Sequence, residues 1–410
     1  MQKMSEPNYR NIGGNGLSAF VVLGLFFLLA LVSKAMVVVV LIITFIVFMH
    51  ESGHYLAARA TGMKATEFFL GFGPRLFSFR RGETEFGVKP VLAGAYVKII
   101  GMTNLDEVDP IDEPRTYRQK SYPKRLLVAS AGSLMHFAMA FVAMFILLSV
   151  FGEPKVEEGK WEVGLVVEES PEGEVSSAAE AGIRSGDRIL ALGAQSTVLW
   201  EDLVAAVRSQ PGVLLPAVVE RDGEVLELLV ELDSTENGEG RLGISAQAVT
   251  SYETVSPLKS IALAVSRLAE MAWQSLRGIW HIASNFGDVL DRIFSAPNDP
   301  TVNENLETRP LSLIGAVQIG ASEQFNNSER LLLFISFNMF VGVFNLLPLL
   351  PLDGGHLLVA SYERVREGRS GKRYMVDISR LMPITYVVII FLAFFGIGAI
   401  YLDIANPLNF

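Results

Sequence analysis

The stretch MVVVVLIITFIVFM-HESGH, residues 36–54, joins a long apolar run directly to two histidines and a glutamate. His50 and His54 are four residues apart, so they face the same side of a helix, with Glu51 beside His50. Two imidazoles and a neighbouring carboxylate suit a zinc ion with an attached general base. Ionisable side chains are costly within a spanning helix, so they are rare there and usually mark a functional site. The stretch therefore predicts hydrolytic metal chemistry at a membrane helix.

The composition is typical of a membrane protein with some soluble mass. Of the 410 residues, 50% are hydrophobic, and the mean hydropathy of +0.37 is too high for an ordinary soluble protein. No cysteine is present, which excludes both a disulfide framework and a thiolate metal site. Metal ligands must come from carboxylates and from the five histidines, which are His50, His54, His136, His281 and His356.

Charge is distributed unevenly along the chain. The formal net charge is −10, but the segment from Glu153 to Glu239 holds 20 acidic and 6 basic residues and so carries −14. The rest of the chain then carries +4, which describes an acidic module attached to a mildly basic membrane body. A nucleic-acid-binding face would need clustered lysine and arginine, and the sequence does not show one. We therefore expect no nucleic-acid partner.

About four transmembrane helices are predicted from runs of apolar residues close to the roughly 20 residues that cross a bilayer. They cover residues 34–60, 126–151, 329–366 and 383–403. Residues 1–33 form an N-terminal extension, and the sequence leaves open whether its apolar part is a further transmembrane helix.

Basic residues set the orientation of these segments. They gather in the loops after the first and third segments, and none follows the fourth. The positive-inside rule places both loops in the cytoplasm and the acidic module outside. The first and third segments then run in the same direction. Residues just after Asn345 therefore lie at a membrane depth similar to that of His50 and His54.

Two regions between the spans have β-strand signals. Residues 61–125 contain a Gly/Pro loop at 69–74, strands around a turn at Arg81-Gly82, and a further strand at 95–100, which predicts a membrane-associated β-hairpin or sheet. Residues 161–250 are predicted to form a small α/β module with a hairpin turn at Asp222-Gly223. Residues 256–328 are expected to be an amphipathic helix on the membrane surface, followed by a polar linker.

The third metal ligand is expected in the stretch NLLPLLPLDGG, residues 345–355. Pro348 and Pro351 interrupt the third span, and Asp353 is then an ionisable group at membrane depth. His356 competes with Asp353 as a ligand, although a simple polar contact suits it better. Asn345 could bond a neighbouring helix or donate a hydrogen bond to a substrate oxyanion.

The sequence predicts the roles of His136 and His281 less specifically. His136 lies in the second span, where it could be a buried hydrogen-bonding residue or line the site. His281 falls on the predicted surface helix, where a role in metal binding is not expected.

With both motifs in place, the chain resembles bacterial site-2 proteases, the intramembrane zinc enzymes that cleave membrane-bound anti-sigma factors. The resemblance rests on His50 to His54, on Gly71-Phe72-Gly73-Pro74 and on Asn345 to Gly355, and it covers almost the whole chain. Ser133 and His136 depart from the family, which usually has proline and asparagine in the corresponding part of the second span.

The resemblance implies a role for each motif. His50, His54 and Asp353 would bind Zn²⁺, and Glu51 would activate water, while the catalytic role of Asn345 as an oxyanion donor rests on its position in the sequence. Residues 161–250 would be a single extracytoplasmic PDZ-like domain. The hairpin and the proline-rich break would contact the substrate, through Gly71, Phe72, Gly73, Tyr96, Val97, Pro348 and Pro351.

The function implied is hydrolysis within the transmembrane segment of single-span proteins, such as anti-sigma factors, in a bacterial cytoplasmic membrane. An upstream site-1 protease would first trim the substrate's ectodomain. The alternative is a non-catalytic zinc-containing PDZ scaffold or chaperone. A transporter is less well supported, because no internal repeat is visible.

Overall fold

The computed structural model describes residues 33–167, 175–235, 238–287, 326–371 and 373–405, with single positions at 20, 24, 27, 30, 31, 315 and 320. The chain divides into two compact units, one formed by residues 1–147 and 257–409 and the other by residues 148–256. Most of the N-terminal extension and of the linker after residue 287 lies outside the described residues. Each unit is described by itself.

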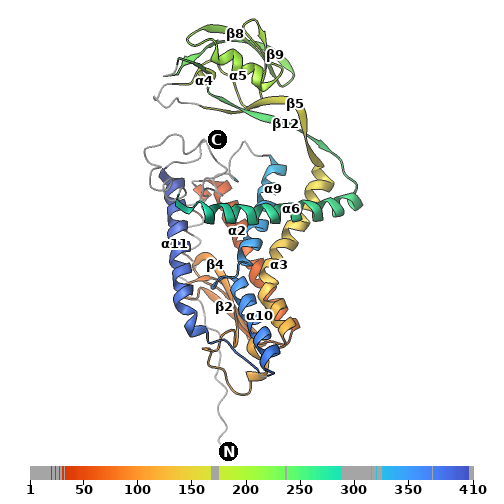
Figure 1. Cartoon of the computed structure of the whole chain (residues 1–410), viewed down its shortest axis with the longest axis vertical. Coiled ribbons are helices and arrows are strands. Elements are labelled where there is room, and N and C mark those ends of the chain that lie inside the picture. Colours follow the sequence, from red (N-terminus) through yellow and green to blue (C-terminus); the bar gives the residue numbers. More distant parts are fainter. Residues whose placement is uncertain are drawn as a thin grey trace, which may run out of the picture. The chain divides into compact units, whose positions relative to one another are not determined.

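Long helices make up most of the first unit (Figure 1). They are α2 (Lys34–Ala60), α3 (Tyr122–Ile146), α6 (Pro257–Ser284), α9 (Asn327–Asn345), α10 (Asp353–Ser370) and α11 (Met382–Ala405). Helix α3 packs against α2, α9 and α10, and α6 packs against α3 and α9. Local signals set several helix ends. Ser33 caps α2 by accepting from the backbone of Met36, and Gly371 ends α10 in the left-handed conformation.

Three helices among the described residues are long and apolar enough to span a membrane. They are Met36–Ala60, Tyr122–Phe151, which includes the π-helical turn Leu147–Phe151, and Met382–Tyr401. Their most apolar windows are only 11%, 39% and 17% buried within the protein. So much exposed apolar helix surface needs an apolar solvent, which makes this a membrane protein.

The predicted third span, residues 329–366, is interrupted at the two prolines, where the sequence predicted a break. It consists of α9 and α10, separated by a non-helical segment at residues 346–352 that contains both prolines. Helix α9 also begins with a polar turn that includes Glu329 and Arg330, so it is not among the three apolar spans. The described helices therefore support three spans by length and composition, compared with the four that the sequence predicted.

A four-stranded sheet follows α2. Its strands are β1 (Ala65–Phe72), β2 (Phe77–Arg81), β3 (Thr84–Val88) and β4 (Val91–Ile99), in the order β2-β3-β1-β4. Strands β1 and β3 are parallel, while β1–β4 and β2–β3 are antiparallel. Strand β4 lies at one edge and packs against α2. The sheet therefore presents an edge strand to the helix that carries the histidines.

The prediction of a Gly/Pro loop at residues 69–74 was wrong for its first four residues. They complete β1, which lies between β3 and β4 because it buries Phe68 and Phe69. Gly71 has a φ of +88° at a register shift between β1 and β4, where a Cβ would lie 2.5 Å from the carbonyl oxygen of Lys89. Glycine there accommodates an irregular strand, which the sequence pattern alone did not separate from a loop.

The second unit is a small α/β fold. Strands β6 (Arg188–Leu192), β7 (Gln195–Ser196), β8 (Leu214–Arg221) and β9 (Glu224–Glu231) form a sheet in the order β7-β6-β8-β9. Helices α4 (Ser177–Glu180) and α5 (Trp200–Arg208) accompany it, together with a short β10–β11 pair (Asp233–Ser234 and Gly240–Arg241). A ribbon of β5 (Glu153–Val166) and β12 (Ile244–Glu253) joins the two ends of the unit. The β8–β9 hairpin turns at Asp222-Gly223, as predicted.

The second unit contains an ion pair whose carboxylate is buried and whose guanidinium is partly exposed. Asp187 is fully buried and accepts hydrogen bonds from the guanidinium of Arg221 at 2.7 Å and from the backbone of Arg184 at 2.8 Å. It ties the start of β6 to the end of β8. Breaking such a pair leaves a charge without its partner.

We expect Asp187→Ala to destabilise the second unit by about 3 kcal/mol, because Arg221 loses its carboxylate. A urea titration of the full chain in detergent, followed by tryptophan fluorescence, measures this change. Glu224→Ala, an exposed position on the same hairpin, is the matched control and should leave the transition unchanged. An unchanged transition in Asp187→Ala would contradict the structural role of the pair.

Candidate metal centre

The two histidines of the motif lie in the second half of α2 and face each other. Their ring centroids are 4.9 Å apart, and the two Nε2 atoms are separated by 3.3 Å. The side chains of His50 and His54 are only 13% and 12% exposed. The four-residue spacing on a helix produces this arrangement directly, as the sequence predicted.

Asp353 approaches both rings from the first residue of α10. Its Oδ2 atom lies 3.5 Å from His50 Nε2 and 3.3 Å from His54 Nε2. The chain reaches this position by folding the segment at residues 346–352 over the start of α10. A Cβ at Gly354 would lie 2.1 Å from the carbonyl oxygen of Leu347. The glycine after the aspartate is therefore required by the close approach of the broken segment.

The three facing atoms fit a single zinc ion. Two atoms bound about 2.0–2.1 Å from one tetrahedral ion lie roughly 3.3–3.4 Å apart. The observed separations between the two imidazole nitrogens and the carboxylate oxygen are 3.3, 3.3 and 3.5 Å. Asp353 Oδ2 is also buried without a hydrogen bond of good geometry, which is costly unless a cation satisfies it. His50, His54 and Asp353 form the metal-competent cluster found among the described residues.

Helix α3 completes the surroundings of this cluster. Nδ1 of His54 lies 2.8 Å from the carbonyl oxygen of Val128, which fixes the tautomer that leaves Nε2 free for a metal. A Cβ at Gly132 would lie 2.3 Å from His50 Cε1 and 2.5 Å from His54 Nε2. Gly132 therefore provides the space for both rings. Sequence reasoning missed both contacts, because the only signal was a glycine among small residues.

The other histidines differ in their proximity to the cluster. His136 is buried, with its Nδ1 2.9 Å from Asn338 Oδ1, and its ring centroid lies 5.1 Å from that of His50. It therefore has both of the features considered for it, a buried hydrogen bond and a place beside the site. His356 is not in the metal-competent cluster and lines a small cavity with Arg125 and Glu363. Ser133 is fully buried.

Glu51 and Asn345 are the residues expected to take part in the chemistry. Glu51 is half-buried on α2, close enough to the backbone N–H of Val97 on β4 to interact with it electrostatically. Asn345 is the last residue of α9 and is half-buried. The side-chain amide of Asn345 makes no hydrogen bond with another described residue.

The residues expected to contact substrate are spread over the sheet and the helix break. Gly71 and Phe72 end β1, and Gly73 follows them. Pro348 and Pro351 are exposed in the segment between α9 and α10, where the Leu350–Pro351 peptide bond is cis.

Tyr96 is engaged within the sheet itself. Its hydroxyl donates to Glu67 at 2.7 Å and accepts from Lys89 at 2.9 Å, and its ring stacks on Phe69 and Phe72. Burial and the bond to Glu67 raise the pKa of Tyr96. These contacts give Tyr96 a structural role in the sheet.

Comparison with known proteins finds zinc metalloproteases, in agreement with the metal-competent cluster. The model of "Peptidase family M50" matches residues 38–390. The zinc metalloprotease Rip1 of Mycobacterium tuberculosis (strain H37Rv) is 32% identical over 395 residues, covering 88% of this chain and 95% of that protein. The protein of the same name from Mycolicibacterium smegmatis is 32% identical over 397 residues, with the same coverage. The putative zinc metalloprotease slr1821 of Synechocystis is 26% identical over 326 residues, covering 77% and 81%.

The space left by Gly132 gives a direct test of the cluster. We expect Gly132→Ala to weaken zinc binding by about 10–100-fold, because the added methyl group displaces both imidazoles. Zinc content after dialysis against a graded chelator measures this change. The matched control is Gly396→Ala on α11, where a Cβ meets nothing within 4 Å. Equal zinc retention in the two variants would contradict the proposed role of Gly132.

Proposed function

The chain belongs to peptidase family M50 and is a zinc metalloprotease of the site-2 protease type, and we propose that it cleaves its substrates within the membrane. The observation that carries this proposal is the position of the motif. His50, Glu51 and His54 lie inside the candidate span Met36–Ala60, whose apolar side chains are largely exposed. Hydrolysis at this position acts on a peptide bond within the membrane region.

A substrate helix must unwind before it can be cleaved, because every amide of an intact helix is already hydrogen-bonded. Strand β4 can hold the unwound segment. It pairs with β1 on one side and packs against α2, and Val97 lies beside Glu51. An extended peptide added along the free edge of β4 would bring its main chain next to the catalytic carboxylate. We assign this role to the backbone of residues 91–99.

The chemistry follows from the residues around the cluster. His50, His54 and Asp353 would hold the zinc ion, which would supply Lewis-acid chemistry and lower the pKa of a water molecule. Glu51 accepts the proton of the attacking water and returns it to the leaving amine. The amide of Asn345 donates a hydrogen bond to the developing oxyanion. Gly132 and Val128 keep the two imidazoles oriented.

We further propose that the substrates are single-span proteins such as anti-sigma factors, already trimmed by a site-1 protease. The membrane is then the bacterial cytoplasmic membrane, and the chain crosses it about four times. The basic loops lie inside, by the positive-inside rule. The acidic second unit lies outside and acts as a PDZ-like module. It either excludes untrimmed ectodomains or binds the new substrate C-terminus.

The ribbon of β5 and β12 allows these two roles of the second unit to be separated. Val166 pairs with Ile244, so a short Gly-Ser turn can replace residues 167–243 and leave the ribbon closed. If the unit excludes ectodomains, this variant cleaves untrimmed substrate. If the unit is a receptor, the variant loses cleavage of trimmed substrate. Wild-type behaviour toward both substrates would contradict a role in substrate selection.

The proton-transfer role of Glu51 predicts the behaviour of Glu51→Gln. The amide keeps the shape of the side chain but cannot accept the proton, so cleavage should fall by at least about a hundredfold while zinc stays bound. Reconstitution with single-span substrates and elemental analysis measure the two quantities. Full activity in Glu51→Gln would contradict the assignment. It would also favour the alternative of a non-catalytic scaffold, a hypothesis that disagrees with the metalloprotease names of the relatives.

The ligand role of Asp353 predicts that Asp353→Ala lowers bound zinc, because one of three protein ligands is lost. Zinc per protein, measured by elemental analysis after gel filtration, is the readout. His281→Ala on α6, which is not part of the metal-competent cluster, should keep the wild-type zinc content. Unchanged zinc in Asp353→Ala would assign the third ligand elsewhere.

A further inference from the structure

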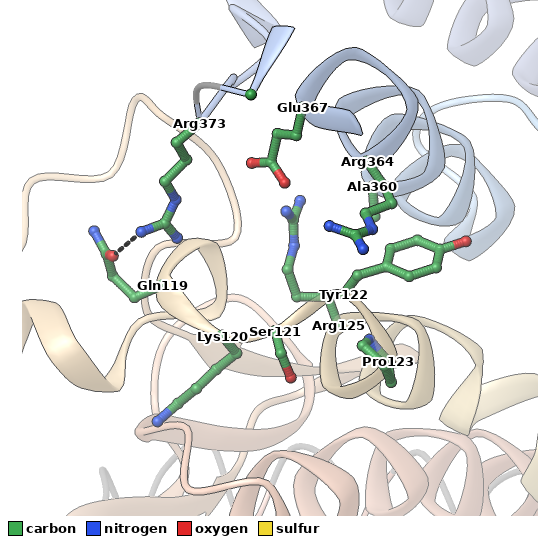
Figure 2. A pocket seen from close by; sticks show the side chains of 11 residues that line it. Gln119, Lys120, Ser121, Tyr122, Pro123, Arg125, Ala360, Arg364, Glu367 and Arg373 are labelled. Carbon is green, nitrogen blue, oxygen red and sulfur yellow. Dashed lines mark hydrogen bonds between the residues drawn. The ribbon is translucent and has the colours of Figure 1, made fainter. Parts of the chain in front are cut away.

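A second cavity lies between the start of α3 and the end of α10, and none of its lining residues belongs to the metal centre. Its volume is about 680 Å³. The lining comes from residues 119–125 on one side and residues 360–373 on the other. Figure 2 shows Arg125, Arg364 and Arg373 extending toward this cavity from different parts of the chain.

The three arginines are not neutralised equally. Arg125 donates to Glu363 at 2.5 Å. Arg373 donates at 2.6 Å to Gln119 Oε1 and at 2.6 Å to the carbonyl oxygen of Arg118, both of which are uncharged acceptors. Arg364 makes no hydrogen bond or ion pair with any residue that the structure describes. Arg373 therefore hydrogen-bonds only uncharged acceptors, with the Glu113 carboxylate near enough to interact with its charge, and Arg364 has no carboxylate partner among the described residues.

The remaining polar groups of the cavity leave it cationic. Glu367 is its one lining carboxylate, and it accepts a bond from the backbone of Tyr374 at 3.3 Å. The ammonium of Lys120 points out of the cavity in Figure 2. Burial and the nearby charges of Lys124 and Arg115 lower the pKa of Lys120, which reflects the crowding of cations at this end of the unit.

This group of side chains suits a phosphate. Planar guanidinium groups bind phosphate oxygens through paired hydrogen bonds, and Arg373 is already held in place by its two neutral acceptors. A cavity of about 680 Å³ is large enough for a phosphorylated headgroup.

The position of the cavity favours a lipid as the source of the phosphate. It lies at the first turn of the candidate span Tyr122–Phe151, the level at which lipid headgroups meet the protein. Leu127 and Val365, on the same two helices, are 45% and 52% exposed and can contact acyl chains. Basic pockets at the ends of membrane helices bind anionic headgroups in this way. We propose that this cavity binds the phosphate group of an anionic phospholipid.

The site connects two helices that also surround the metal centre. Arg125 belongs to α3, which carries Gly132, and Arg364 belongs to α10, which begins at Asp353. A bound headgroup bridges the two helices and stabilises their packing. The proposal depends on the cavity alone and does not require the proteolytic function.

Native mass spectrometry of the full-length protein in detergent tests the site. The probes are dioleoylphosphatidylglycerol, dioleoylphosphatidylcholine and inorganic phosphate. The test variant is Arg364→Gln with Arg373→Gln. The matched control is Arg369→Gln, an exposed arginine on α10 that does not line the cavity. Arg364→Gln alone removes no bond among the described residues, so it serves if the double variant fails to fold.

We expect phosphatidylglycerol to bind the wild type and Arg369→Gln more tightly than phosphatidylcholine does. The double variant should bind phosphatidylglycerol about tenfold more weakly, because two guanidinium contacts are lost. Equal phosphatidylglycerol binding in all three proteins would overturn the site. The assignment to a lipid would be overturned if inorganic phosphate displaced phosphatidylglycerol and raised the melting temperature of the protein as much as phosphatidylglycerol does.

Discussion

Three polar atoms from two distant helices converge in this protein, and much of the surrounding structure serves that convergence. The two imidazole nitrogens and the Asp353 oxygen lie 3.3–3.5 Å from one another, a spacing that fits three ligands of one shared cation. Bringing them together requires the break between α9 and α10 and the close approach of Gly354 to that break. It also requires Gly132 on α3, where any side chain would occupy the space of the rings.

The membrane setting explains why the remaining elements are arranged around this cluster. Helices α2, α3 and α11 expose apolar surface that only a bilayer can cover. A polar cluster on such a helix needs partners from within the protein. Helix α3 supplies a carbonyl group to His54, α10 supplies Asp353, and the edge strand β4 lies beside Glu51. The same packing of α3 against α10 creates the cationic cavity between the start of α3 and the end of α10.

Sequence reasoning predicted the parts of the structure that follow from local periodicity or a strong motif. The spacing of His50 and His54 determines a shared helix face. The prolines at 348 and 351 indicated the break that brings Asp353 to the rings. Close approaches between distant segments leave no such local signal. The sequence therefore could not predict that the two imidazoles fill the space beside Gly132. It also could not predict that residues 119–125 and residues 360–373 line one cavity.

Strand β1 shows a different limit. The glycines near its end indicate a loop when the sequence is considered alone. Only the parallel pairing with β3 and the burial of Phe69 show that these residues belong to a strand. The number of spans shows a related limit. Residues 329–366 were predicted as a further span broken by the prolines, but their hydropathy did not reveal that the polar first turn of α9 leaves this helix outside the three apolar helices.

The central claim is that His50, His54 and Asp353 bind one zinc ion. X-ray absorption spectroscopy at the zinc edge, on the purified full-length protein, tests this claim most directly. The account predicts a four-coordinate shell of nitrogen and oxygen at about 2.0–2.1 Å, with outer-shell scattering from two imidazoles. A shell without imidazole scattering, or one that is unchanged when both histidines are replaced by alanine, would contradict it.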